Sequence, residues 1–382
     1  MINQSKLPWV GTTIFTVMSK RAAEHGAVNL SQGFPDYDVD ERLIALVTEA
    51  MQAGQNQYAP MPGVPELNAA IATKIQHDYG WQPNPETEIT VTSGATQGLY
   101  SVIGAMVGTG DEVIVIEPSY DSYIPAIASY GGVARTVPLR PPHFKVDWQE
   151  VASQINSRTR LIMINTPHNP CGVVLEDEDM QQLEALVLQH GLYVVSDEVY
   201  EHMIYDGKTH CSVLRYPGLY SRSFALFSFG KSLHVTGWKT GYVIAPPELT
   251  TEYRKIHQFT VFSGNRPMQV AVARYLERFA DFPSLSTFFQ TKRDLFLQKM
   301  ANLPLRFLPC HGSYFILADY SEVTNEHDRD FAIRLTKEGG VATIPLSPFY
   351  REGHDGKLLR FCFAKKEETL IEAAERLKKY FV

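Results

Sequence analysis

The chain has 382 residues, of which 44% are hydrophobic and 20% are charged, and its formal net charge is -7. A chain of this length exceeds one ordinary core, so we expect a large and a small domain. The negative charge argues against nucleic acid or an anionic membrane as the main partner, and no uninterrupted apolar run is long enough to span a bilayer.

The cysteines are scattered along the chain, with no CxxC pair and no clustering with histidine; they are Cys171, Cys211, Cys310 and Cys362. This distribution favours reduced thiols over a disulfide framework or a zinc site, so we expect no bound metal. The N-terminal residues lack the basic-then-apolar pattern of a secretory signal. Together these features predict a cytoplasmic α/β protein.

Short apolar runs alternate with helical patterns between residues 88 and 250, which is typical of a mainly parallel sheet. The predicted strands cover residues 88–94, 111–117, 160–166, 192–198, 223–229 and 240–246. One apolar stripe, made by Leu99, Val102, Ile103 and Met106, predicts a helix between the first two strands. A further helix is predicted over 177–190, with Gly191 as its stop.

The end of the chain differs from its middle. Residues 311–382 contain two short strand patterns, 313–320 and 357–363, and a closing helix over 367–381. We expect a large α/β domain over 40–285 and a smaller α+β domain made of 1–39 and 286–382. A long helix could run through the boundary between residues 281 and 292.

Ligands of open α/β sheets bind at the carboxyl ends of the strands. The first predicted strand ends in Ser93-Gly94-Ala95-Thr96-Gln97 and leads into a helix, whose free N–H groups could bind a phosphate. The second ends near Tyr120, whose ring could stack on a flat heterocycle. A tight connection and ordinary core packing are the plain alternatives for these two segments.

The third strand ends in Asn165-Thr166-Pro167-His168-Asn169-Pro170, a rigid loop in which Asn169 could donate a hydrogen bond to a phenolate-type oxygen. A turn-forming asparagine is the alternative. Asp197 closes the fourth strand, where a carboxylate in apolar surroundings needs a cationic partner. A protonated pyridine nitrogen, a metal ion and a salt bridge all meet that need. Tyr200 could reach the same oxygen as Asn169.

The fifth strand ends at Lys231, in a neighbourhood of small and apolar residues. Desolvation and nearby cations lower the pKa of such a lysine, and its neutral amine can attack an aldehyde. Ser228 and Lys239 offer a hydroxyl and a cation suited to a phosphate. Most lysines are solvated surface charges, so Lys231 alone would be a weak signal. The features at the five strand ends, however, appear in order along the chain, and together they are the parts that one cofactor requires.

The motifs NQYAPMPG (56–63), NTPHNP (165–170), SDEVY (196–200) and SFGKSLHVTGWKTG (228–241) are together highly specific. In them, and over nearly the whole chain, the sequence resembles class I aminotransferases of the fold-type I pyridoxal-phosphate superfamily. It is most similar to the branch of methionine aminotransferases and kynurenine/glutamine transaminases. The resemblance implies transfer of an amino group from a neutral or aromatic L-amino acid, of the methionine, glutamine, kynurenine, phenylalanine or tyrosine type, to a 2-oxo acid by a ping-pong mechanism.

By that resemblance, Lys231 forms the Schiff base with pyridoxal 5′-phosphate and shuttles a proton, while Asp197 keeps the pyridine nitrogen protonated. The resemblance implies further cofactor contacts: Tyr120 for the ring, Asn169 and Tyr200 for the phenolic oxygen, and Ala95, Thr96, Ser228 and Lys239 for the phosphate. It also implies that Tyr58 reaches the phosphate in the other subunit, which makes the enzyme a homodimer with shared active sites.

For the substrate, the resemblance implies that Arg360 clamps the α-carboxylate bidentately, helped by Asn169 and Gly33. In LLRFCFA the alternation places Leu359, Phe361 and Phe363 on one face and Arg360 on the other. The distal pocket is expected to include Tyr123, the segment near Ile14 and Phe15, and Phe262 from the other subunit. These residues are apolar or aromatic, and no second arginine is seen for an ω-carboxylate.

Two positions depart from the general family pattern: Lys239 stands where arginine is frequent, and His234 where a small or apolar residue is frequent. We expect Lys239 still to bind phosphate and His234 to affect local packing only. Two other functions fit the same motifs. A pyridoxal-phosphate β-lyase acting on cysteine S-conjugates would release pyruvate and ammonia without an acceptor, and a regulatory domain would bind the cofactor or an amino acid without turnover.

Overall fold

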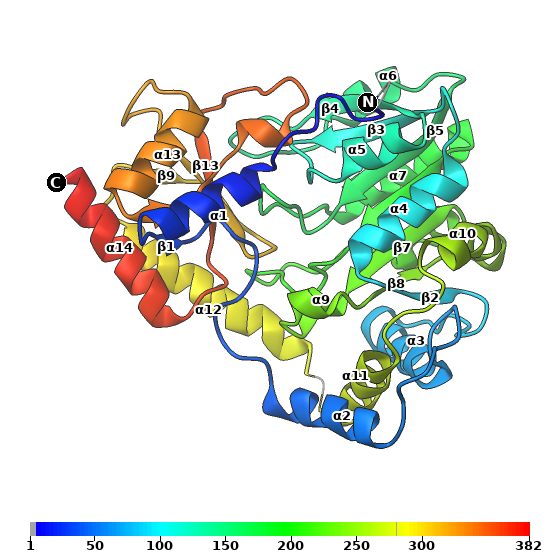
Figure 1. Cartoon of the computed structure of the whole chain (residues 1–382). Coiled ribbons are helices and arrows are strands. Elements are labelled where there is room, and N and C mark those ends of the chain that lie inside the picture. The colour runs from blue at the N-terminus through cyan, green and yellow to red at the C-terminus, as the bar shows by residue number, and fades with distance from the viewer. Residues whose placement is uncertain (1–4, 280) are drawn as a thin grey trace.

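The computed structural model describes residues 5–279 and 281–382. One half of the molecule is built on a seven-stranded sheet in the order β2-β8-β7-β6-β5-β3-β4 (Figure 1). Its strands are Ile89–Thr92 (β2), Glu112–Glu117 (β3), Val133–Pro138 (β4), Thr159–Asn165 (β5), Tyr193–Asp197 (β6), Ser223–Ser228 (β7) and Gly241–Ile244 (β8). All neighbours are parallel except β8, which is antiparallel to both β2 and β7. The α/β class with a mainly parallel sheet is thus confirmed.

Six of these strands coincide with predicted ones, and β4 was missed. Strand β4 lies at the edge of the sheet beside β3, and only Ala134 and Val137 of its residues are buried. An edge strand that is half exposed carries too few apolar residues for a clear pattern.

The helices are α1 (Ile14–Glu24), α2 (Glu41–Gln52), α3 (Pro65–Tyr79), α4 (Ala95–Met106), α5 (Tyr123–Ser129), α6 (Trp148–Ser153), α7 (Asp177–His190), α8 (Pro217–Tyr220), α9 (Phe229–Ser232), α10 (Pro247–Thr260), α11 (Arg266–Arg278), α12 (Pro283–Met300), α13 (Asp328–Glu338) and α14 (Glu367–Phe381). Short 3-10 turns cover Val213–Arg215, Thr236–Trp238 and Ser347–Phe349. The predicted helices correspond to α4, α7 and α14, and Gly191 ends α7 with a left-handed φ of 66°.

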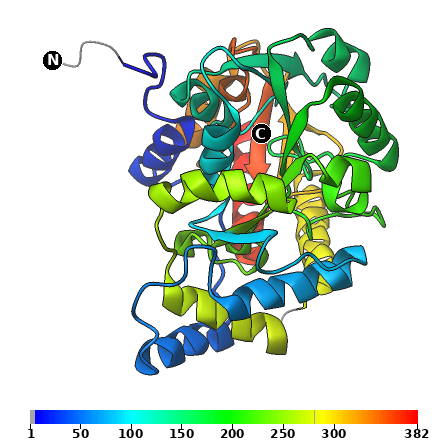
Figure 2. The same cartoon turned by 90° about the vertical axis from the view of Figure 1, so that its right-hand side faces the viewer.

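Both faces of the large sheet are buried, because alternating side chains of its strands pack against helices on opposite sides. Val113 and Val115 of β3 belong to an apolar cluster with α4, α5 and α10, whereas Ile114 and Ile116 belong to a second cluster with α6 and α7. Two covered faces are what a parallel sheet requires. Figure 2, turned by 90°, shows α2, α3 and α11 gathered at one end of the molecule.

The other half carries an antiparallel sheet in the order β12-β13-β10-β9 and a parallel pair, β1-β11. These strands are Val28–Asn29 (β1), Arg306–Phe307 (β9), Phe315–Asp319 (β10), Val341–Ala342 (β11), Ile344–Pro345 (β12) and Leu358–Cys362 (β13). Because β1 pairs with β11, the N-terminal segment joins the C-terminal part of the chain (Figure 1).

Helix α12 is continuous from Pro283 to Met300, so the predicted boundary between 285 and 286 falls in its first turn. The domain limits 40–285, 1–39 and 286–382 therefore stay a prediction. Among the described helices, none combines the length and apolarity needed to cross a membrane. The four cysteines are all buried and unpaired.

Candidate active site

A cavity of about 330 Å³ lies at the carboxyl ends of β2, β5, β6 and β7, facing residues of the second half of the molecule. The residues that the sequence singled out and that line it are Phe15, Gly33, Ala95, Thr96, Tyr120, Asn169, Asp197, Tyr200, Ser228, Lys231, Lys239 and Arg360. The lining residues that sequence reasoning missed include Gln32, Leu99, Asn165, Val199 and Phe315. Four predicted residues, Ile14, Tyr58, Tyr123 and Phe262, lie outside this lining.

The start of α4 forms one wall of the cavity. Gly94 caps the helix with a φ of 79°, and a side chain there would press on Lys239, whose Nζ would lie 3.2 Å from the added Cβ. Glycine is therefore required both by the backbone and by the close approach of the lysine. The N–H groups at Ala95 and Thr96, together with Lys239, make an electropositive corner that suits a phosphate.

Asp197 ends β6 and is partly buried in the cavity wall. The Tyr123 hydroxyl donates to its Oδ2 at 2.6 Å, and the Val199 N–H donates to Oδ1 at 3.4 Å. Burial raises the pKa of Asp197 to about 6, although both hydrogen bonds oppose that shift. Tyr123 was expected to line the distal substrate pocket. It lies instead behind the carboxylate, in the apolar cluster that α5 shares with Val195 of β6.

The loop after β5 is held by its two asparagines. The Asn165 side chain donates to the Asp197 backbone carbonyl at 2.8 Å and accepts from the Asn169 N–H at 2.7 Å. Asn165 thus fixes the loop to the neighbouring strand end, which leaves the Asn169 side chain on the cavity. The rigid loop predicted from the asparagines and prolines has this physical origin.

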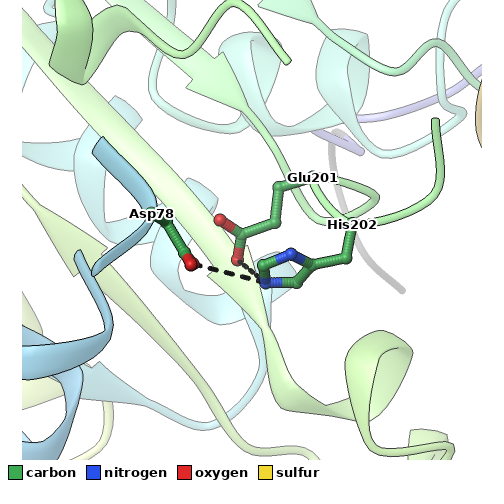
Figure 3. Close-up of side chains that lie close together, drawn as sticks. All are labelled: Asp78, Glu201 and His202. Atoms are coloured by element: carbon green, nitrogen blue, oxygen red, sulfur yellow. Dashed lines mark ion pairs between the residues drawn. The ribbon is translucent and has the colours of Figure 1, made fainter. Parts of the chain in front are cut away.

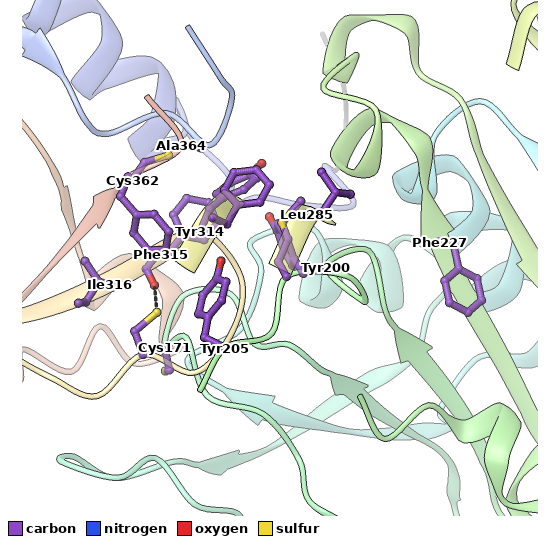
Figure 4. Close-up of a cluster of buried hydrophobic side chains, with 14 of the residues drawn as sticks. Cys171, Tyr200, Tyr205, Phe227, Leu285, Tyr314, Phe315, Ile316, Cys362 and Ala364 are labelled. Carbon is purple, nitrogen blue, oxygen red and sulfur yellow. Dashed lines mark hydrogen bonds between the residues drawn. The ribbon is translucent and has the colours of Figure 1, made fainter. Parts of the chain in front are cut away.

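Lys231 lies on the short helix α9, directly after β7. Its Nζ donates to the Tyr314 hydroxyl at 2.8 Å and to the Gly33 carbonyl at 3.3 Å. Burial lowers the pKa of Lys231 to about 8, and the nearby cations Lys239 and Arg360 act in the same direction. Tyr314 was not predicted. Figure 4 shows it in a buried cluster with Tyr200 and Phe315, whose ring centroids are 5.1 and 4.8 Å from its own.

Arg360 lies on β13 and is 1% exposed. One N–H donates to Asn169 Oδ1 at 2.8 Å and another to the Ser31 carbonyl at 2.9 Å, while Nε has no partner among the described residues. The guanidinium carbon lies 3.9 Å from the centroid of the Phe315 ring. Burial lowers the pKa of Arg360 to about 10, which still leaves it charged at neutral pH.

Tyr58 and Phe262 lie apart from the cavity, on the surface. They are 76% and 54% exposed, and their rings meet edge to face at 5.0 Å. Phe259, at the end of α10, is 90% exposed. We call these three side chains the aromatic patch. Within a single chain, Tyr58 and Phe262 do not join the predicted site.

A second, largely buried cluster includes the two residues that follow Tyr200 in the chain. Figure 3 shows Asp78, Glu201 and His202 converging, with the His202 Nε2 3.7 Å from Asp78 Oδ2 and 3.5 Å from Glu201 Oε1. Their ligand atoms lie close enough to hold a metal ion. However, the Lys74 ammonium lies 3.0 and 2.9 Å from the same two carboxylates. The lysine therefore already supplies the cation that the acids require.

Comparison with known sequences relates this chain to a protein family. The family model of the class I and II aminotransferases matches residues 25–377. The methionine aminotransferase of Escherichia coli K12 is 49% identical over 379 residues, which cover 99% of this chain and 98% of that protein. Human kynurenine–oxoglutarate transaminase 1 is 33% identical over 413 residues, with 98% and 96% covered.

Comparison with solved structures gives the same family as comparison with sequences. YbdL from Escherichia coli, described as having a methionine aminotransferase function, matches with a TM-score of 0.97 and 49% identity over 99% of this chain and 100% of that one. The N-succinyldiaminopimelate aminotransferase of Mycobacterium tuberculosis matches with a TM-score of 0.95 and 35% identity, again over 99% and 100%. These relatives give no support to the lyase or the regulatory alternative. The chain belongs to the class I and II aminotransferases and is an enzyme with the fold-type I architecture of that pyridoxal-phosphate-dependent family.

Proposed function

We propose that the enzyme binds pyridoxal 5′-phosphate in this cavity and moves the amino group of a neutral or aromatic L-amino acid to a 2-oxo acid. One observation carries the proposal: the partly buried amine of Lys231, the partly buried carboxylate of Asp197 and the helix start at Ala95 line a single cavity. A nucleophile for an aldehyde, an anion for a pyridine nitrogen and a cradle for a phosphate are the three features that this cofactor needs.

Several contacts around the cavity support this cofactor. The close approach of Gly94 and Lys239 supports phosphate binding, with Ala95, Thr96 and Ser228 as further ligands. Asp197 is the anion that would hold the pyridine nitrogen protonated, and Tyr120 would lie against the ring. Asn169 and Tyr200 would contact the phenolic oxygen. When bound, the cofactor supplies an electron sink for the negative charge that develops at the substrate Cα.

Lys231 would both attach the cofactor and carry protons. Because burial lowers the pKa of its amine to about 8, a fraction of the side chain is neutral at physiological pH. A neutral Nζ can accept the proton from the substrate Cα and donate it to the cofactor carbon, which is general acid–base catalysis. The Tyr314 hydroxyl and the Gly33 carbonyl hold that nitrogen in place.

Arg360 would bind the α-carboxylate. Its two terminal N–H contacts fix the guanidinium plane, and each terminal nitrogen keeps a second N–H that can donate to the substrate. Of the described residues that line the cavity, Arg360 is the one arginine, and Phe15, Leu99, Val199 and Phe315 add apolar surface. That character favours methionine, glutamine, kynurenine and aromatic amino acids over aspartate as donors. The methionine and kynurenine names of its relatives point the same way.

The aromatic patch supports a homodimer with shared sites. Three large exposed aromatic side chains, Tyr58, Phe259 and Phe262, are costly to leave in water on one surface. A second copy of the chain would cover them. Each copy's Tyr58 and Phe262 would then reach the phosphate and the substrate in the other copy's site. We also propose a cytoplasmic location, because four buried, unpaired thiols are typical of a reducing compartment.

The absorption spectrum of the purified protein tests the proposal. We expect a yellow cofactor band that bleaches when methionine, glutamine or an aromatic amino acid is added without a 2-oxo acid, and returns when a 2-oxo acid follows. The Lys231→Met variant, which cannot attach the cofactor covalently, should show neither this yellow band nor its bleaching. A protein that takes up no pyridoxal 5′-phosphate would refute the cofactor and the site together, and a preference for aspartate would refute the substrate class.

A further inference from the structure

Tyr123 makes the shortest hydrogen bond that the Asp197 side chain accepts. The phenol donates to Oδ2 at 2.6 Å, whereas the Val199 N–H reaches Oδ1 only at 3.4 Å. Tyr123 is 3% exposed and begins α5, whose residues Ala126 and Ile127 pack in the same apolar cluster. Its position is therefore set by the core of the large sheet.

The same turn also positions Tyr120. The Tyr123 backbone N–H donates to the Tyr120 carbonyl at 3.1 Å, and the two rings meet edge to face with centroids 5.8 Å apart. Tyr120 lines the cavity, while Tyr123 lies behind Asp197. One helix start thus supports the proposed stacking ring and the proposed pyridine-nitrogen anion at once.

The charges around Asp197 explain why a donor is needed there. Burial raises the pKa of its carboxyl, and the Glu198 carboxylate adds to that shift, whereas Lys231 opposes it. The Tyr123 hydrogen bond is the largest effect that lowers the pKa of Asp197. Burial and the neighbouring carboxylate raise the pKa of Tyr123 far above its usual value, so the phenol remains a donor. The other phenols near the carboxylate, Tyr120 and Tyr200, also stay protonated because their pKa values are raised.

We propose that Tyr123 is a positioning residue that keeps Asp197 ionised and oriented for the pyridine nitrogen of the cofactor. The inference rests on the proposed function. It replaces the expected place of Tyr123 in the distal substrate pocket. Removing the phenolic oxygen leaves Oδ2 without its donor, and Asp197 then binds a proton more readily. A protonated Asp197 cannot stabilise a pyridinium ion.

The test is titration of pyridoxal 5′-phosphate into the cofactor-free, full-length enzyme and its Tyr123→Phe variant. A hydrogen bond to a charged group corresponds to roughly ten- to a hundredfold in affinity, and we expect Tyr123→Phe to weaken binding by that factor. The matched control is Tyr220→Phe, because Tyr220 donates to the Glu88 carboxylate at 2.7 Å outside the cavity lining. That variant should bind the cofactor like the wild type.

A 1-deaza analogue of the cofactor, with carbon in place of the ring nitrogen, separates positioning from folding. Tyr123→Phe should bind this analogue no more weakly than the wild type does, because no pyridinium ion is formed. Damage to the fold would weaken both ligands alike. In the wild type, affinity for pyridoxal 5′-phosphate should fall as pH drops through about 6, where Asp197 gains a proton, and the fall should begin at higher pH in Tyr123→Phe.

An Asp197→Asn background gives the second check, since its amide has no charge to preserve. There, adding Tyr123→Phe should leave cofactor affinity unchanged. Equal binding by the wild type and Tyr123→Phe, or equal weakening for cofactor and deaza analogue, overturns the role of Tyr123 while the proposed function stands. If the wild type itself binds no pyridoxal 5′-phosphate, the proposed function fails first.

Discussion

Arg360 and Asn169 are joined by a 2.8 Å hydrogen bond from a guanidinium N–H to the amide oxygen, across 191 positions of sequence. The bond links β13 of the small antiparallel sheet to the loop after β5 of the large sheet. A second N–H of Arg360 is fixed by the Ser31 carbonyl. The guanidinium plane is therefore set in advance, which would reduce the entropy lost on binding the α-carboxylate proposed for this site.

Arg360→Lys should cost the enzyme its recognition of the α-carboxylate. Lysine keeps the charge but loses the planar fork and both fixed N–H contacts, so we expect kcat/KM for methionine to fall by roughly ten- to a hundredfold. The kcat/KM for methioninamide, which lacks the carboxylate, should fall only slightly. The measurement is the ratio of kcat/KM for the acid and the amide. In Arg135→Lys, where the arginine pairs with Glu112 at the sheet, that ratio should stay at its wild-type value.

Residues at strand ends are predictable from the sequence. Apolar runs of the right length locate each strand, and the ends of parallel strands meet at one edge, so the pattern alone brings Asp197 and Lys231 together. Tyr123 and Tyr314 are different. Their partners lie 74 and 83 positions away, and only the docking of α5 and β10 decides that their phenols meet a carboxylate and an amine. A tyrosine in an apolar segment gives no signal beyond core packing.

The low pKa of Lys231 predicts how cofactor uptake depends on pH. With a pKa of about 8, the neutral fraction of the amine rises by about tenfold between pH 7 and pH 9 and then levels off. An ordinary lysine, with a pKa of 10.5, would give a steeper rise of about a hundredfold without a plateau. The rate of absorbance change after mixing cofactor-free enzyme with pyridoxal 5′-phosphate distinguishes the two.

Tyr314→Phe should move that plateau to lower pH. The phenolic oxygen accepts a hydrogen bond from Lys231 Nζ, and such a bond stabilises an ammonium more than a neutral amine. Its loss therefore lowers the pKa of Lys231 further. Tyr205→Phe removes a phenol that donates to the Ser313 carbonyl, and it should leave the midpoint in place. A midpoint that stays or rises in Tyr314→Phe would contradict the contact.

Lys74→Met should destabilise the fold through its two carboxylate partners. Glu201 and Asp78 lie 2.9 and 3.0 Å from the ammonium, and all three side chains are largely buried. Breaking a buried ion pair from one side costs about 3–5 kcal/mol, because a charge is left without a partner. Urea unfolding should show that loss, and Lys74→Met with Glu201→Gln should recover part of it.

The same cluster predicts a response to zinc. A chelator should not change the thermal midpoint of the wild type, because Lys74 holds the place of a cation. In Lys74→Met, the ligand atoms of Asp78, Glu201 and His202 remain close together, so added Zn²⁺ should raise the midpoint. Adding His202→Ala should abolish that rise. A wild type destabilised by the chelator would show that a metal, and not the lysine, balances the acids.

The proposed sharing of active sites between two subunits predicts complementation between two defective variants. Lys231→Met lacks the proposed nucleophile, and Tyr58→Ala lacks the proposed phosphate contact from the other subunit. If Tyr58 acts across the dimer, a mixed dimer contains one site with both defects and one with neither. Equal co-expression should then restore roughly a quarter of the wild-type sites, half of the dimers being mixed. Two affinity tags purify the mixed species, and activity is assayed at limiting cofactor. Activity no higher than the mean of the two parent dimers would mean that Tyr58 and Lys231 serve the same subunit, and the aromatic patch would then have to be covered in another way.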